Sequence, residues 1–141
     1  MDIRNLTATY AVSPQIDPSD LVALKAAGFT TIIDNRPDGE IPPHLHADAM
    51  QAAAKGLGLT FLSNPVINGA MTMDNVAAQK AAMAASSGPV FAYCASGNRS
   101  SVVWALAHAG QMPVDDLIGI PAKFGYQLDH LRGQIAALAQ G

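Results

Sequence analysis

Short runs rich in β-branched and aromatic residues alternate with helix-length segments along this chain. The clearest runs are Phe29–Asp34, Leu59–Leu62 and Pro89–Tyr93, and Thr7–Ser13 has the same character near the N-terminus. Residues of these types favour strands. Strands separated by helix-length segments pair in parallel, because each crossover returns the chain to the same edge of the sheet. We therefore predict an α/β fold with three layers: a mostly parallel sheet of four or five strands, flanked by helices.

Capping and breaking residues mark where the intervening helices begin and end. Asp17 offers a cap, with Pro18 or Ser19 in the first turn, to a helix that runs to about Ala27, and Gly28 ends this helix. Asp74 offers a cap to a later helix that ends near Ser86. The remaining predicted helices run from Pro42 or Pro43 to Gly56 or Gly58, over Val102–Ala107, and over two segments between Pro113 and about Ala139.

Length, charge and cysteine content narrow the class of protein. The 141 residues suggest one domain, 1–141, and the single cysteine cannot form an intramolecular disulfide. The formal net charge of −3 gives no electrostatic reason to expect nucleic acid or an anionic membrane as a partner. The N-terminus lacks the apolar core of a signal peptide, and no apolar stretch is long enough to span a bilayer. We therefore expect a cytoplasmic protein.

The segment Cys94-Ala-Ser-Gly-Asn-Arg99 lies between the predicted strand Pro89–Tyr93 and the predicted helix Val102–Ala107. We interpret Cys94 as a nucleophile, because ligands bind at the carboxyl ends of parallel strands and a helix N-terminus favours a thiolate. Arg99 offers paired donors to an oxyanion. Gly97 lets the backbone turn its N–H groups inward. We expect the substrate anion to bind the amides of this loop and first turn, those of Ala95, Ser96, Gly97, Asn98, Arg99 and Ser100.

Two serines follow Arg99. We expect the Ser100 hydroxyl to hydrogen-bond the sulfur of Cys94 and help it leave at the end of a cycle, and we expect Ser101 to cap the helix. The alternative is that Cys94 is a small buried hydrophobic residue without reactivity. The order glycine, arginine, serine, serine after the cysteine favours an anion-binding loop instead.

Four residues separate Cys94 from Arg99. Cysteine phosphatases place five residues between the same two groups, whereas single-turn sulfurtransferases of the rhodanese type place four. A smaller ring gathers the amides into a smaller cradle. The spacing therefore favours a persulfide sulfur, or the terminal end of thiosulfate, over a whole phosphoryl group.

A phosphatase of this kind also needs a general acid to protonate the departing oxygen. The loop expected to face Cys94, Ser63–Met71, contains no carboxylate. Asp34 and Asp38 follow another strand and are candidates, although the sequence alone does not place them. The segment Arg36–Glu40 is either a polar rim beside the cysteine loop or a solvated turn.

Three motifs resemble one known family. The segments Tyr10–Gln15, Ile33–Glu40 and Tyr93–Ser101 are similar, in this order, to the bacterial beta-lactamase hydrolase-like family with a phosphatase-like domain. The resemblance implies a fold like that of dual-specificity phosphatases, for members labelled as phosphatases or as sulfur transferases. It also implies that Cys94 is the nucleophile and Arg99 the anion-binding arginine, with Gly97 and Ser100 matching the glycine and serine of the loop.

One position departs from the family pattern. Ala95 stands where family members and rhodaneses commonly have an arginine. The loss of this cation is expected to weaken the attraction for thiosulfate, and to affect a glutathione persulfide or a protein persulfide less.

Three functions follow from these observations. We favour a sulfurtransferase that carries sulfane sulfur as a Cys94 persulfide to a thiol acceptor, with a small-molecule or protein persulfide as donor. The alternative is a cysteine-dependent phosphatase acting on phosphotyrosine or another phosphate monoester. A third is a non-catalytic module that binds an anionic group. We expect no cofactor, and no metal, because His44 and His46 would point in different directions on a helix and no third ligand stands at a familiar spacing.

Overall fold

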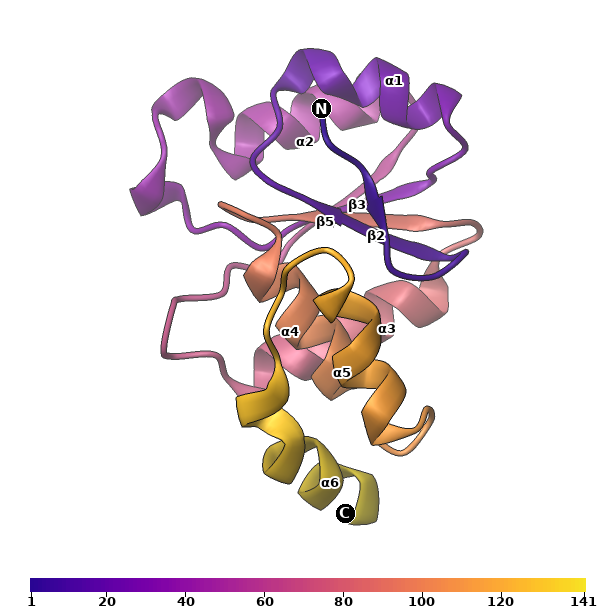
Figure 1. Cartoon of the computed structure of the whole chain (residues 1–141). Helices are drawn as coiled ribbons and strands as arrows, with labels where there is room; N and C mark the ends of the chain where they lie inside the picture. Colours follow the sequence, from indigo (N-terminus) through magenta and orange to yellow (C-terminus); the bar gives the residue numbers. More distant parts are fainter.

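The computed structural model describes residues 1–141 and contains one five-stranded sheet (Figure 1). The strand order is β1-β2-β5-β3-β4, and β2, β5, β3 and β4 run parallel. The two-residue strand β1 pairs antiparallel with β2 at one edge. The strands are β1 (Arg4–Asn5), β2 (Tyr10–Ser13), β3 (Thr31–Asp34), β4 (Thr60–Ser63) and β5 (Val90–Tyr93). The predicted α/β fold with a mostly parallel sheet is confirmed.

Helices cover both faces of this sheet (Figure 1). One face carries α1 (Leu21–Ala26) and α2 (Ala47–Gly56). The other carries α3 (Met73–Ala85), α4 (Asn98–Ala107) and α5 (Val114–Ala122), and α6 (Arg132–Gln140) packs against α4 and α5. No helix is long and apolar enough to cross a membrane.

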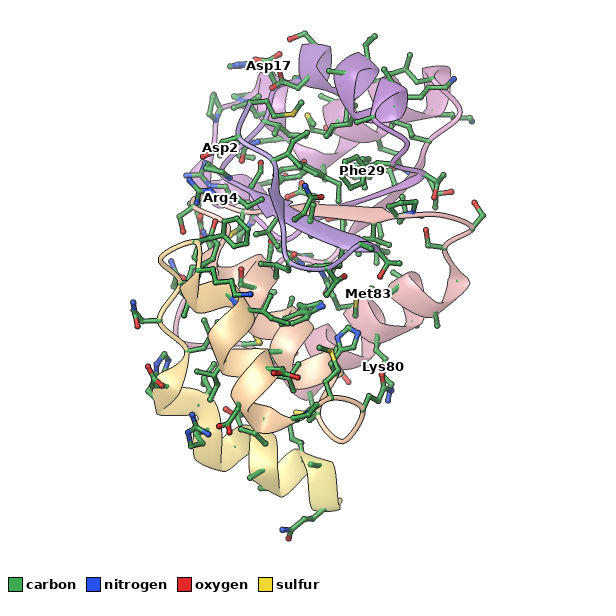
Figure 2. All side chains as sticks on the ribbon, turned by 45° about the vertical axis from the view of Figure 1, so that its right-hand side comes forward. Asp2, Arg4, Asp17, Phe29, Lys80 and Met83 are labelled. Carbon is green, nitrogen blue, oxygen red and sulfur yellow. The ribbon has the colours of Figure 1, made fainter.

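Two buried clusters hold the layers together, one on each face of the sheet. Successive strand residues point to opposite faces, so Ile32 joins the cluster under α1 and α2 while Ile33 joins the cluster under α3–α6. The central strands are buried on both faces, which is why their sequences are continuously apolar. In Figure 2, Phe29 lies on the α1–α2 side of the sheet and Met83 on the opposite side.

Four helix starts differ from the prediction. A 3-10 turn (Pro18–Asp20) precedes α1, and α4 begins at Asn98, four residues before the predicted Val102. The helix predicted from Pro42 or Pro43 is broken at His46, whose backbone is extended (φ −61°, ψ 159°), so a short 3-10 turn (Pro43–Leu45) precedes α2. The side chain of Asp38 accepts the amide of Ala47 at 2.9 Å and thereby starts α2 anew. Asp74 does not cap α3, because Thr72 forms the capping box with Asn75 one turn away.

Candidate active site

Cys94 is the first residue after β5, the strand between β2 and β3. Its side chain is 1% exposed, and its sulfur accepts the backbone N–H of Gly97 at 3.1 Å. Gly97 has a φ of +96°, a conformation that favours glycine, and this turn directs its amide back to the sulfur. The loop therefore places the thiol at the carboxyl end of a central strand, as the sequence predicts.

The first turn of α4 keeps free amides beside the sulfur. Gly97 is the N-cap of α4, and no side chain caps this helix. The amides of Ala95, Ser96, Arg99 and Ser100 donate to no protein group, whereas that of Asn98 donates to the Ser96 hydroxyl at 3.2 Å. Uncapped N–H groups at a helix N-terminus favour an anion, so the loop can stabilise a thiolate and the negative charge of a substrate.

Arg99 is held in one orientation from the side away from the sulfur. Its Nη1 and Nη2 each donate to a carboxylate oxygen of Glu40 at 2.8 Å, and Nη1 also donates to the Val66 carbonyl at 2.8 Å. A guanidinium has five N–H donors. Glu40 and Val66 use three of them and leave the Nε–H and one Nη2–H, which form a side-on fork for an anion.

Glu40 is the functional residue that the sequence left undecided. From the sequence, the segment Arg36–Glu40 is either a polar rim beside the cysteine loop or a solvated turn. In the structure, its last residue, Glu40, pairs with Arg99. Arg36 contacts the same carboxylate, with its Nε 3.2 Å from Glu40 Oε1. The pairing with Arg99 lowers the pKa of Glu40, so this carboxylate stays ionised at neutral pH.

Ser100 lies in the loop region but does not contact the sulfur. It is fully buried, and its hydroxyl donates to Asn35 Oδ1 at 2.9 Å. Its one proton is therefore used by Asn35, so it forms no hydrogen bond to Cys94 in this structure, and its role in catalysis stays a prediction. Ser101 is not a cap either, because its hydroxyl donates back to the Gly97 carbonyl at 2.8 Å.

A buried polar network continues from Ser100 under the cysteine loop. Asn35 donates to Gln79 Oε1 at 2.9 Å, and Gln79 Nε2 donates to the Tyr10 hydroxyl at 3.0 Å. The Tyr10 hydroxyl donates in turn to the Ser100 carbonyl at 2.8 Å. Gln79 is fully buried, and its partners are Tyr10 in β2, Asn35 directly after β3 and Asn64 directly after β4. This network fixes the first turn of α4, and its one sequence signal is a lone glutamine in an alanine-rich helix.

A residue of the C-terminal segment, Tyr126, also hydrogen-bonds the cysteine loop. The Tyr126 hydroxyl donates to the Ser96 carbonyl at 2.7 Å, and it accepts Arg4 Nη1 at 2.5 Å. The guanidinium of Arg4 lies 5.5 Å from the centre of the Tyr126 ring. In Figure 2, Arg4 lies next to Asp2, to which it is also paired at 2.6 Å. Sequence reasoning missed both Arg4 and Tyr126, because they lie more than one hundred positions apart.

Neither aspartate considered as a general acid is hydrogen-bonded to the cysteine loop. Asp34 is fully buried and faces the α1–α2 side beside Tyr93; its Oδ1 accepts the Arg36 amide at 2.9 Å and its Oδ2 has no partner. Burial raises the pKa of Asp34 to about 6. Asp38 bonds the start of α2. Glu40 is the only carboxylate hydrogen-bonded to the segment from Cys94 to Ser101.

Neither histidine of the His-x-His pair joins a metal-binding cluster. His46 Nε2 lies 3.0 Å from the Ile41 carbonyl, and no group of three histidine, cysteine or acidic side chains comes together anywhere in the structure.

Residues 2–111 match the family described as "Beta-lactamase hydrolase-like protein, phosphatase-like domain". This chain belongs to that family. A beta-lactamase hydrolase-like protein from Xylella fastidiosa is 32% identical over 130 residues, which are 91% of this chain and 30% of that protein. The chain therefore spans less than a third of the length of the curated relatives it matches.

Solved structures of similar fold include phosphatases. A candidate phosphatase from Neisseria meningitidis has a TM-score of 0.80 and 29% identity over 98% of this chain and 99% of its own. The catalytic domain of a PP-IP phosphatase from S. cerevisiae has a TM-score of 0.71 at 10% identity, covering 94% of this chain and 82% of its own, and shows the fold alone.

The comparisons confirm the family and the cysteine-phosphatase-like fold. The family description and the Neisseria meningitidis structure favour an enzyme, and among enzymes a hydrolase, over the sulfur transfer that the sequence suggests. The catalytic roles of Cys94, Arg99 and Ser100, and the binding roles of the loop residues, stay predictions.

Proposed function

We propose that this protein transfers sulfane sulfur through a persulfide on Cys94. The observation that carries this proposal is the pairing of the one carboxylate at the loop, because both oxygens of Glu40 accept N–H groups of Arg99 at 2.8 Å. Glu40 is kept ionised by Arg99, so no carboxylic acid stands ready to protonate a departing alkoxide. Sulfite and thiolates leave without a proton, so sulfur transfer needs no such acid.

The reaction has two balanced steps. In the first, the Cys94 thiolate attacks the sulfane sulfur of the donor, a bond forms between the two sulfur atoms, and the donor's own bond to that sulfur breaks, with its electron pair leaving on sulfite or a thiolate. In the second, an acceptor thiolate attacks the outer sulfur of the Cys94 persulfide, takes it, and returns Cys94 as a thiolate.

The loop supports each step with the groups already described. The amide of Gly97 and the N-terminus of α4 stabilise negative charge on Cys94 and on the persulfide. The free fork of Arg99 orients the anionic end of the donor. Glu40 is a positioning residue that fixes this fork.

Phosphate monoester hydrolysis is the second candidate, and the comparisons favour it. The family is described as phosphatase-like, and solved structures of similar fold are described as phosphatases. In this reaction Cys94 would accept the phosphoryl group and Arg99 would bind two of its oxygens. With no acid at the loop, such an enzyme should prefer esters with good leaving groups, such as aryl phosphates.

One experiment compares the two candidates. The protein is incubated with glutathione persulfide or with thiosulfate, and intact mass spectrometry records whether Cys94 gains one sulfur atom that glutathione then removes. The Cys94→Ser variant is the control and should gain none. Turnover of an aryl phosphate that Cys94→Ser abolishes, together with no persulfide from either donor, would reverse the order of the two candidates.

A further inference from the structure

A cavity of about 430 Å³ adjoins the cysteine loop on the side of Arg99. It lies between the segment that follows β4, the first turns of α4, and the turn Asp129–Leu131 with the start of α6. Its volume lies in the range that accommodates small organic ligands. Asn98 and Arg99 line this cavity and also belong to the first turn of α4, so a molecule in the cavity lies beside the N-terminus of that helix.

The cavity wall combines apolar surface with the guanidinium of Arg99, whose Nε–H and one Nη2–H are not used by Glu40 or Val66. Eight of its fifteen lining residues are hydrophobic, and none is acidic. Its only ionisable side chains are Arg99 and His130. Two of its hydrophobic residues, Ile67 and Met73, are 61% and 53% exposed, so their apolar side chains are accessible to a molecule in the cavity. The lining therefore complements a molecule with an apolar body and an anionic end.

We propose that this cavity binds the organic body of the substrate, while the loop from Cys94 to Arg99 binds its anionic end. This inference rests on the proposed function for the nature of the reacting group. The donor is then an organic persulfide with an aliphatic or aromatic body, and thiosulfate, which has no such body, is a poor donor. The absence of an arginine at Ala95 agrees with this assignment, because binding energy comes from the cavity in place of a second cation.

Binding of unreactive analogues tests the cavity without sulfur transfer. Isothermal titration calorimetry compares n-hexyl sulfate with methyl sulfate, two anions with the same head group. Burial of one methylene strengthens binding roughly fourfold, so hexyl sulfate should bind roughly tenfold or more tightly than methyl sulfate. Equal affinities would overturn the assignment.

Neutral polar substitutions locate the binding site. Ile67→Asn and Met73→Gln should each weaken hexyl sulfate severalfold and leave methyl sulfate unchanged, because the head-group site is intact. Val22→Asn is the matched control, since Val22 is 59% exposed on α1, on the other face of the sheet, and this variant should bind like the parent. If the cavity variants bind hexyl sulfate as well as the control does, the body lies elsewhere and the proposal fails.

Kinetics separate this proposal from the proposed function. With an alkyl persulfide as donor, Ile67→Asn should raise KM while kcat stays near that of the parent. If hexyl sulfate binds in the cavity but Cys94 gains no sulfur, the cavity assignment is supported and the sulfur transfer reaction is refuted. If Cys94 gains sulfur but chain length has no effect on binding, the sulfur transfer stands and the cavity assignment is refuted.

Discussion

A methyl group added at Gly97 would test how tightly the cysteine loop is held. The backbone φ of +96° already disfavours alanine, at a cost of about 1–2 kcal/mol. The added Cβ would also overlap the hydroxyl oxygen of Tyr126 and lie 3.0 Å from its Cζ. Overpacking of this kind costs about 1–3 kcal/mol. Gly97→Ala should therefore lower the free energy of unfolding by about 2–5 kcal/mol in total.

A second glycine separates the two contributions. Gly28 has nearly the same φ, +99°, but a Cβ there would meet no atom within 4 Å. Gly28→Ala should therefore show the backbone cost alone. In a Tyr126→Phe background, where the overlapping oxygen is absent, Gly97→Ala should cost about 1–3 kcal/mol less than in the parent.

Urea denaturation measures the free energies of all four variants, and the rate of Cys94 alkylation by iodoacetamide reports the sulfur's environment. We expect Gly97→Ala to change the alkylation rate and Gly28→Ala to leave it unchanged, because only the first displaces the amide that bonds the sulfur. Equal costs for Gly97→Ala and Gly28→Ala, or no relief by Tyr126→Phe, would refute the idea that Tyr126 confines the loop.

Three further predictions concern the surrounding charges and hydrogen bonds. Glu40→Gln should lower the free energy of unfolding by about 1–2 kcal/mol at pH 7. In urea denaturation at acidic pH this difference between variant and parent should vanish, because a carboxylate with a lowered pKa loses its stabilising effect as the pH falls through that pKa. Asp34, whose pKa is raised from 3.8 to about 6, should cause stability to fall by about 1–3 kcal/mol as the pH rises from 4 to 6, and urea midpoints of Asp34→Asn should lack this slope. Gln79→Leu should cost about 2–4 kcal/mol in thermal unfolding, because buried partners lose their hydrogen bonds, whereas Lys80→Leu, at the exposed neighbouring position, should change stability by no more than about 0.5 kcal/mol.

Sequence signals correctly predicted those elements of the fold that depend on residues adjacent in the sequence. The β-branched runs became β3 and β5, and Gly28 ends α1 with a positive φ. The position of Cys94 followed from one strand and one helix that are adjacent in the sequence. Strand β1 was missed because two residues carry no periodicity, and the break at His46 depends on a capping side chain eight positions earlier.

The hydrogen bonds that hold Arg99 and the cysteine loop in place could not be predicted in the same way. Glu40 reaches Arg99 across 59 positions, and Tyr126 reaches Ser96 across 30. Such contacts depend on how two loops pack in space, and no periodicity or motif spacing encodes that packing. Parallel topology alone indicated that the segment after β3 lies near the cysteine loop, which is why Arg36–Glu40 was a candidate at all.

The C-terminal helices are needed for any fragment of this protein that is moved into another protein. The family match ends at residue 111, yet Leu117, Tyr126 and Ile135 belong to the same buried cluster as Trp104. A version cut at the family border would expose the tryptophan face of α4 and lose the tyrosine that holds the cysteine loop. For recombination or grafting, the smallest piece that keeps the cysteine loop supported therefore extends through α6, beyond the residues that the family model matches.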